Sequence, residues 1–322
     1  MSKHIQEPLE QNPEAGVYLR SMENYGECNN DIYFVQFNPK KRQLATAGSN
    51  YMAYLWDLRN EEQLDFNPKP LPHITPHSSQ QTQRFTSDVS SVHWNSSGNR
   101  IITSSSDMVS RVWEIDDKDE VYIKNVKGFN VCLLNSKFNE HCGNLVATGG
   151  MMSEIYVWDC ESDDLREIAC FDHSEIDSNF KGIEIEWQNS KNVAVTGKSK
   201  YIFLWNIDNP KAPICKWEGH TNEVDIIAWD PMKRMLASSS NEPYVLIWKP
   251  ESNEPHLTLN KITSPVLSIK WSNLPQGSQA GTESQGSQAD VLLAVGCQDG
   301  MIQIWNIRLN QMIVSLDTQD KE

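Results

Sequence analysis

The residues best suited to chemistry are histidines, acids and serines that could form a catalytic triad. His220 and Asp225 lie close together in the chain, and serine is frequent throughout. In a triad the histidine takes the proton of the serine hydroxyl while the acid orients its ring. The chain has neither the Gly-x-Ser-x-Gly turn that presents such a serine nor a Walker loop, a G-x-G-x-x-G turn or an H-E-x-x-H helix. We therefore expect no catalytic residue and no enzymatic activity.

Metal ions, cofactors and nucleic acids are also disfavoured by the composition. The seven cysteines include no C-x-x-C pair, so their spacing predicts neither a zinc site nor a disulfide framework and favours reduced thiols. Lys and Arg number 28 against 43 Asp and Glu, a net charge of -15 that disfavours phosphate backbones and suits a basic partner. No run approaches the roughly 20 apolar residues of a membrane helix. We expect no cofactor, metal, membrane, direct nucleic-acid contact or small-molecule substrate.

Tryptophan is the residue that the chain uses systematically, with 11 copies among 322 residues. Six of them close a short strand-like run, and each follows a second aromatic, by about 19 residues in five of the six units. A period in the forties with several short strands per unit is typical of a WD-repeat β-propeller. The six aromatic pairs are Phe37 and Trp56, Trp94 and Trp113, Phe138 and Trp158, Trp187 and Trp205, Trp229 and Trp248, and Trp271 and Trp305.

The runs around these aromatics predict strands because aliphatic and small residues alternate between Gly, Asn, Ser and Asp turns, without a helical period. We expect an all-β fold with six four-stranded blades over residues 16–317. Residues 1–15 and 318–322 are expected to be tails, and the Gly-, Ser- and Gln-rich stretch 276–289 a disordered loop. The outermost strands are expected at 70–75, 120–126, 166–172, 212–219, 254–260 and 311–317. A further strand-like segment, 16–21, belongs to no unit, so either the chain lacks a C-terminal unit or this segment packs as a spare edge.

One stretch, GHTNEVDIIAWDPMKRMLASSSNEPYVLIW (219–248), resembles the transducin β-like corepressor subunits. The next unit continues as SPVLSIKWS with a Gly-, Ser-, Gln- and Ala-rich insertion, as in that family, and the order of units is similar from about residue 16 to 317. The resemblance implies a nuclear, non-enzymatic subunit that joins a corepressor and a histone deacetylase and contacts histone tails. It also implies eight blades, whereas six are recognisable here, which leaves open whether C-terminal blades are missing.

A buried polar network is expected in the fifth unit, because a buried indole N–H and a turn acid both need partners. His220 follows a glycine, Ser238 and Trp248 can join it, and Glu242 stands where Asp is usual. The position six residues before each closing Trp reads Asn50, Asp107, Met152, Ser199, Glu242 and Asp299. We expect a structural role for Asp107, Asp299 and the closing tryptophans Trp56, Trp113, Trp158, Trp205, Trp248 and Trp305.

A partner-binding face is implied by the resemblance. In the family's geometry the residues four and six before the first aromatic of each unit point to the face where the innermost strand begins. An acidic rim around apolar anchors would suit a basic peptide, although these acids could equally serve only to solvate the surface. The expected residues are Asp31, Tyr33, Asp88, Ser90, Leu134, Lys181, Ile183, Glu223, Asp225 and Leu267.

A second function is suggested by a short motif. Trp56, Asp57 and Arg59 resemble the Trp-Asp-x-Arg box through which substrate receptors of cullin-type ubiquitin ligases dock their adaptor, and 305–308 is a weaker copy. The alternative hypothesis is therefore a ligase substrate receptor. A third possibility is a scaffold of an unrelated complex.

Overall fold

The computed structural model describes residues 31–49, 51–59, 68–73, 88–161, 165–272 and 291–318. The segments 1–15, 16–21 and 276–289, for which a tail, a spare strand and a loop were expected, lie outside these ranges. Within them the chain forms 24 strands. No helix in the described ranges is long and apolar enough to cross a membrane.

The strands form six antiparallel sheets of four consecutive strands each, which we call blades 1 to 6. Blade 1 contains β1 (Ile32–Phe37), β2 (Gln43–Gly48), β3 (Met52–Asp57) and β4 (Lys69–Pro72), and blade 2 contains β5 (Val89–Trp94), β6 (Arg100–Ser105), β7 (Val109–Ile115) and β8 (Val121–Gly128). Blade 3 contains β9 (Leu133–Phe138), β10 (Leu145–Gly150), β11 (Glu154–Asp159) and β12 (Glu167–Asp172), and blade 4 contains β13 (Gly182–Trp187), β14 (Asn192–Gly197), β15 (Tyr201–Asn206) and β16 (Cys215–Glu218). Blade 5 contains β17 (Val224–Trp229), β18 (Leu236–Ser240), β19 (Val245–Trp248) and β20 (Leu257–Leu259), and blade 6 contains β21 (Val266–Trp271), β22 (Leu292–Cys297), β23 (Met301–Asn306) and β24 (Gln311–Asp317).

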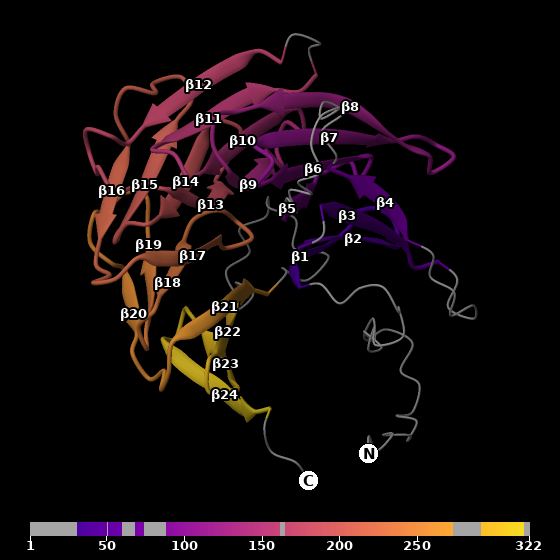
Figure 1. The fold of residues 1–322 in the computed structure, drawn as a ribbon. Helices are drawn as coiled ribbons and strands as arrows, with labels where there is room; N and C mark the ends of the chain where they lie inside the picture. Colours follow the sequence, from indigo (N-terminus) through magenta and orange to yellow (C-terminus); the bar gives the residue numbers. More distant parts are fainter. Residues whose placement is uncertain are drawn as a thin grey trace, which may run out of the picture.

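The blades are arranged in an arc, with the first strand of each near the centre and the fourth at the periphery (Figure 1). The hydrophobic core lies between neighbouring blades, in five clusters that each join one blade to the next. Between the described strands of blades 6 and 1, packing of comparable extent is absent. The fold is a β-propeller of six WD-type blades, which confirms the expected fold class.

The outermost strands overlap the expected segments, and four of the six are shorter, whereas β4 begins one residue before its segment and β8 continues two residues beyond its own. β16 occupies four residues of the expected 212–219, and β20 only three of 254–260, whereas β24 matches 311–317 in full. Prolines inside or beside the expected segments, such as Pro213 and Pro255, remove a backbone donor and limit pairing there.

The closing tryptophan of each blade is held by a hydrogen bond within the described part of the chain. In four blades its indole N–H donates to a hydroxyl on the neighbouring strand: Trp56 to Thr46, Trp113 to Thr103, Trp158 to Thr148 and Trp248 to Ser238, at 2.8–3.0 Å. In blades 4 and 6 the equivalent residue is valine, so Trp205 donates to His173 Nε2 and Trp305 to Gln303 Oε1, both at 3.0 Å. Where valine replaces the hydroxyl residue, another side chain therefore accepts the hydrogen bond of the indole.

The tryptophan that ends the innermost strand joins two blades. Its indole N–H donates to a backbone carbonyl of the preceding blade, as in Trp271 to Ala228 at 2.9 Å. The other three bonds are Trp94 to Gln36 at 3.1 Å, Trp187 to Lys137 at 3.2 Å and Trp229 to Glu186 at 3.4 Å.

Blade 3 has Phe138 at this position, which has no donor. There the junction with blade 2 uses other bonds: Ser136 N–H donates to Ser91 Oγ, Ser90 Oγ to the Leu133 carbonyl, and Phe138 N–H to His93 Nδ1. Blades 2 and 3 are thus joined by hydrogen bonds from other groups in place of the indole bond.

We predict that Thr148→Val lowers the free energy of unfolding by about 1–3 kcal/mol, because it leaves the buried Trp158 indole N–H without its acceptor. Thr148→Ser keeps the hydroxyl and should cost clearly less. Urea unfolding followed by tryptophan fluorescence measures both. Equal losses would contradict the prediction, because the methyl group, which only Thr148→Ser removes, would then matter as much as the hydroxyl that Thr148→Val removes.

Candidate functional site

The expected partner-binding residues lie at the start of the six innermost strands, on one face of the propeller. Two bonds join β9 and β13: Asn135 Nδ2 donates to the Ile183 carbonyl near the starts of the strands, and the Trp187 indole donates to the Lys137 carbonyl near their ends, both at 3.2 Å, so these strands run side by side in the same direction. The ten side chains are exposed or half-buried: Asp31, Tyr33, Asp88, Ser90, Leu134, Lys181, Ile183, Glu223, Asp225 and Leu267. We call this surface the entry face.

The structure brings only some of these residues into contact. The Tyr33 hydroxyl donates to Asp88 Oδ2 at 3.2 Å and so connects blades 1 and 2. Desolvation and this hydrogen bond raise the pKa of Tyr33 above its usual range. On blade 5, partial burial and then the neighbouring Glu223 raise the pKa of Asp225. The acids of the entry face therefore occupy two places, at blades 1 and 2 and at blade 5. Between them lie the half-buried side chains that blades 3 and 4 place on this face, Leu134, Lys181 and Ile183.

The four carboxylates of the entry face have no basic partner in the described ranges. Asp31, Asp88, Glu223 and Asp225 take part in no ion pair there.

A half-buried ion cluster near the centre was not expected from the sequence. Lys137 Nζ of blade 3 lies 2.8 Å from Glu184 Oε1 and 2.7 Å from Glu186 Oε1 of blade 4. Burial opposes the charged form of Lys137, but the two carboxylates outweigh it and raise its pKa. The cluster joins two blades rather than presenting a reactive amine.

The His220 network has the partners named from the sequence. His220 Nδ1 lies 2.7 Å from Glu242 Oε2, its Nε2 lies 2.8 Å from Ser238 Oγ, and Ser238 Oγ also accepts the Trp248 indole. Burial raises the pKa of Glu242, but hydrogen bonds from Thr221 and its neighbours outweigh this and lower it to about 2. Burial lowers the pKa of His220. A neutral ring that donates from Nδ1 and accepts at Nε2 fits these partners.

A second histidine network, in blade 2, was missed. His73 Nε2 lies 2.7 Å from Thr103 Oγ1, which also accepts the Trp113 indole, and its Nδ1 lies 2.7 Å from Arg111 Nη1. Because Arg111 can only donate, His73 Nδ1 must accept, and the neutral ring carries its hydrogen on Nε2. This is the opposite tautomer to that of His220. Arg111 also pairs with Asp107 Oδ2 at 2.7 Å.

A third network lies in blade 4. His173 Nδ1 donates to the Ser153 carbonyl at 2.8 Å and its Nε2 accepts the Trp205 indole. Ser199, which stands where Asp is usual, donates to Asp177 Oδ2 at 2.6 Å. His73 and His173 directly follow the outermost strands β4 and β12, and His220 follows β16 after one intervening residue, Gly219. That position, and not the preceding glycine, was the signal that could have found them.

Asp299 has a simpler role in blade 6. Its Oδ2 lies 2.7 Å from Thr263 Oγ1, and its Oδ1 accepts the Met301 N–H at 3.1 Å. The carboxylate therefore closes a turn without a histidine.

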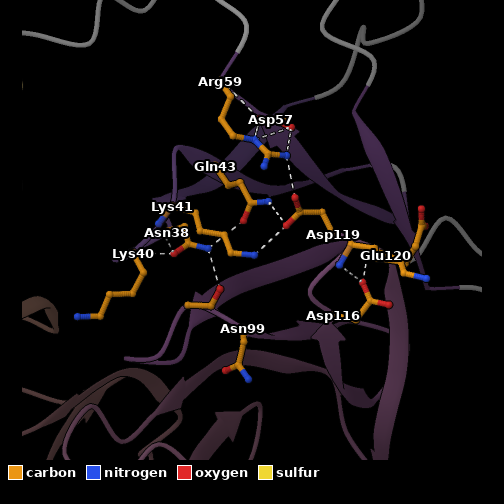
Figure 2. Close-up of polar contacts among 12 residues, drawn as sticks. Asn38, Lys40, Lys41, Gln43, Asp57, Arg59, Asn99, Asp116, Asp119 and Glu120 are labelled. Atoms are coloured by element: carbon orange, nitrogen blue, oxygen red, sulfur yellow. Dashed lines mark hydrogen bonds and ion pairs between the residues drawn. The ribbon is translucent and has the colours of Figure 1, made fainter.

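The Trp-Asp-x-Arg motif lies at the opposite face and is engaged within the chain (Figure 2). Trp56 is buried with its indole on Thr46. Arg59 Nη2 lies 2.5 Å from Asp57 Oδ2 and 2.8 Å from Asp119 Oδ2 of blade 2. Adaptor docking through Arg59 would require both ion pairs to be given up.

Asp119 is the centre of this clamp between blades 1 and 2. Lys41 Nζ lies 2.8 Å from its Oδ1, and Gln43 Nε2 donates to the same oxygen at 3.3 Å (Figure 2). The hydrogen bond from Lys41 is the largest cause of the lowered pKa of Asp119. In the second copy of the motif, Arg308 is exposed.

No group of three His, Cys, Asp or Glu side chains within the described ranges is arranged to hold a metal ion.

Comparisons with known proteins agree with this architecture. The family model of the WD domain, G-beta repeat, matches residues 76–114 and 211–249. The C-terminal WD40 domain of Sif2 superposes with a TM-score of 0.66 at 17% identity, covering 90% of this chain and 75% of that one.

Among curated relatives, the F-box-like/WD repeat-containing protein TBL1X of Mus musculus is 25% identical over 70% of this chain and 39% of its own length. The WD40 repeat-containing protein HOS15 of Arabidopsis thaliana is 25% identical over 76% of this chain and 37% of its own. The protein transport protein SEC31 of Yarrowia lipolytica is 29% identical over 51% and 14%. The chain spans about two fifths of the length of the first of these relatives.

The fold, the repeated tryptophans and these matches define a WD-repeat β-propeller protein. Within that class, the chain resembles the transducin β-like subunits represented by TBL1X.

We predict that acid destabilises the fold through His173, whose pKa burial lowers from 6.5 to about 4. The unfolded chain binds the proton first, so this contribution to stability is complete above pH 6.5 and is lost as the pH falls towards 4, by about 3 kcal/mol. His173→Gln should flatten the pH dependence of the unfolding free energy between pH 4 and 6.5. The exposed His141→Gln is the control, and a flattening of the same size there would contradict the assignment.

Proposed function

We propose that this chain is a non-enzymatic scaffold subunit of a nuclear corepressor–histone deacetylase assembly, and that it binds a basic, histone-tail-like peptide on its entry face. WD-repeat propellers are interaction scaffolds in general, and the similarity to TBL1X supports the particular assembly. The partners would be the corepressor, the deacetylase and histone tails.

The observation that carries the peptide-binding part is that, among the described residues, no Lys or Arg forms an ion pair with the four entry-face carboxylates. Acids elsewhere on the propeller are commonly neutralised by Lys or Arg, as Asp119 is by Lys41 and Arg59. Exposed Leu267 and half-buried Ile183 supply apolar contacts at the same end of the innermost strands. Complementary charge around apolar anchors favours a Lys- or Arg-rich peptide with a few apolar side chains.

We expect a fluorescein-labelled histone H4 tail peptide to bind with an affinity that falls as salt rises, because exposed charges are screened. Changing all four entry-face acids to their amides should weaken binding by about tenfold or more. The matched control changes four acids that are paired with Lys or Arg, and it should have little effect: Glu120, Glu161, Asp208 and Glu218. Fluorescence anisotropy measures both variants, and equal weakening would mean that net charge alone matters.

The assembly is tested by affinity purification of the tagged protein from its own cells, followed by mass spectrometry. We expect corepressor and histone deacetylase peptides. Recovery of a cullin and its adaptor, lost on Arg59→Ala, would instead establish the ligase-receptor alternative. Enrichment of neither set would favour a scaffold of another complex.

A further inference from the structure

A groove between the outer parts of blades 2 and 3 has no role in the assignments above. It has a volume of about 350 Å³ and is lined by the end of β8, the connection that follows it, and strands β11 and β12. That connection includes Phe129 and runs directly into Cys132 and Leu134. The groove therefore lies at the rim of the entry face.

The walls of the groove are suited to a cation. The rings of Phe129 and Tyr156 lie 5.7 Å apart at 56°. Lys127 Nζ lies 5.9 Å from the centroid of Phe129 and 5.9 Å from that of Trp158, and it makes no ion pair within the described ranges. Aromatic faces attract cations through their quadrupoles. The chain's own ammonium group already occupies such a position.

Two carboxylates give the groove an excess of negative charge. Glu154 and Glu167 both line it, and within the described ranges neither forms an ion pair with Lys or Arg. The Ser153 hydroxyl donates a hydrogen bond to Glu154 Oε2 at 3.1 Å. With burial and Cys170, these two acids raise the pKa of Tyr156 to about 12. Against two acids stands the single cation Lys127.

We propose that this groove binds one lysine or arginine side chain of a basic peptide, with Glu154 and Glu167 accepting its hydrogen bonds and the contacting rings of Phe129 and Tyr156 packing against one side of its stem. Charge-assisted bonds to carboxylates supply the specificity. The volume is at the small end for ligand sites, which suits one side chain rather than a cofactor. Lys127 competes for the same rings. That the bound side chain belongs to a histone-tail-like peptide rests on the proposed function; that the groove binds a lysine or arginine side chain does not.

Butylguanidinium, which mimics an arginine side chain, tests the groove without any peptide. Met152 lines the groove, and its ¹³C-labelled methyl group can be identified by the loss of one NMR signal in Met152→Leu. We expect this signal to shift and saturate on titration of the wild-type protein. The shift should be lost in Glu154→Gln/Glu167→Gln. An unshifted Met152 signal in the wild-type protein would overturn the proposal that the groove binds such a side chain.

The same variants then distinguish the groove from the entry face. Binding of the labelled H4 tail peptide should weaken about three- to tenfold in Glu154→Gln/Glu167→Gln and tighten about twofold in Lys127→Met, which removes the competing cation. The control is Glu251→Gln/Glu254→Gln, two exposed acids of blade 5.

Peptide binding by Glu154→Gln/Glu167→Gln that weakens no more than in the control would contradict the proposed role of the groove. Weaker peptide binding by Lys127→Met would also contradict it. Neither result would affect the proposal for the entry face. A saturating Met152 shift without peptide binding would retain the groove and overturn the proposed function.

Discussion

The structure depends on the need of buried indole N–H groups for an acceptor. All eleven tryptophans are buried, and each donates one hydrogen bond. An unsatisfied buried donor costs about 1–3 kcal/mol, so each tryptophan fixes what must lie opposite it. Closing tryptophans fix the arrangement inside a blade, and first-strand tryptophans fix one blade against another. Where Phe138 removes the donor, Ser91 and His93 of the preceding blade take over the joint.

The spacing of the tryptophans predicted the blades because both members of each pair sit at fixed positions in a repeating meander. Contacts between units were harder to predict. Lys137 meets Glu184 and Glu186 only because two innermost strands from different repeats lie side by side, and nothing in a single repeat indicates it. A glycine before the histidine does not indicate His73 or His173, which follow Pro72 and Asp172; their position after an outermost strand does.

Charge is organised differently on the two faces. At the end that carries the turns after the third strands, acids are tied to bases across blades, as Asp119 is to Arg59 and Glu161 is to Arg100. On the entry face the carboxylates have no such partners within the described chain. Intramolecular pairing uses up charge to hold blades together, whereas unpaired carboxylates keep a long-range attraction for basic molecules. This difference between the entry-face carboxylates and the acids of the opposite end, rather than the overall charge of -15, is what the proposed peptide-binding function rests on.

The bonds between blades also have a direction. Each first-strand indole donates backwards, to a carbonyl of the blade made before it, so a blade's inner joint is finished only when the next blade has been synthesised. On the ribosome the growing array therefore always carries one incomplete surface, which moves along the chain by one repeat at a time. Since exposed strands and apolar surface invite aggregation during synthesis, this order limits the vulnerable part of the nascent protein to its newest repeat.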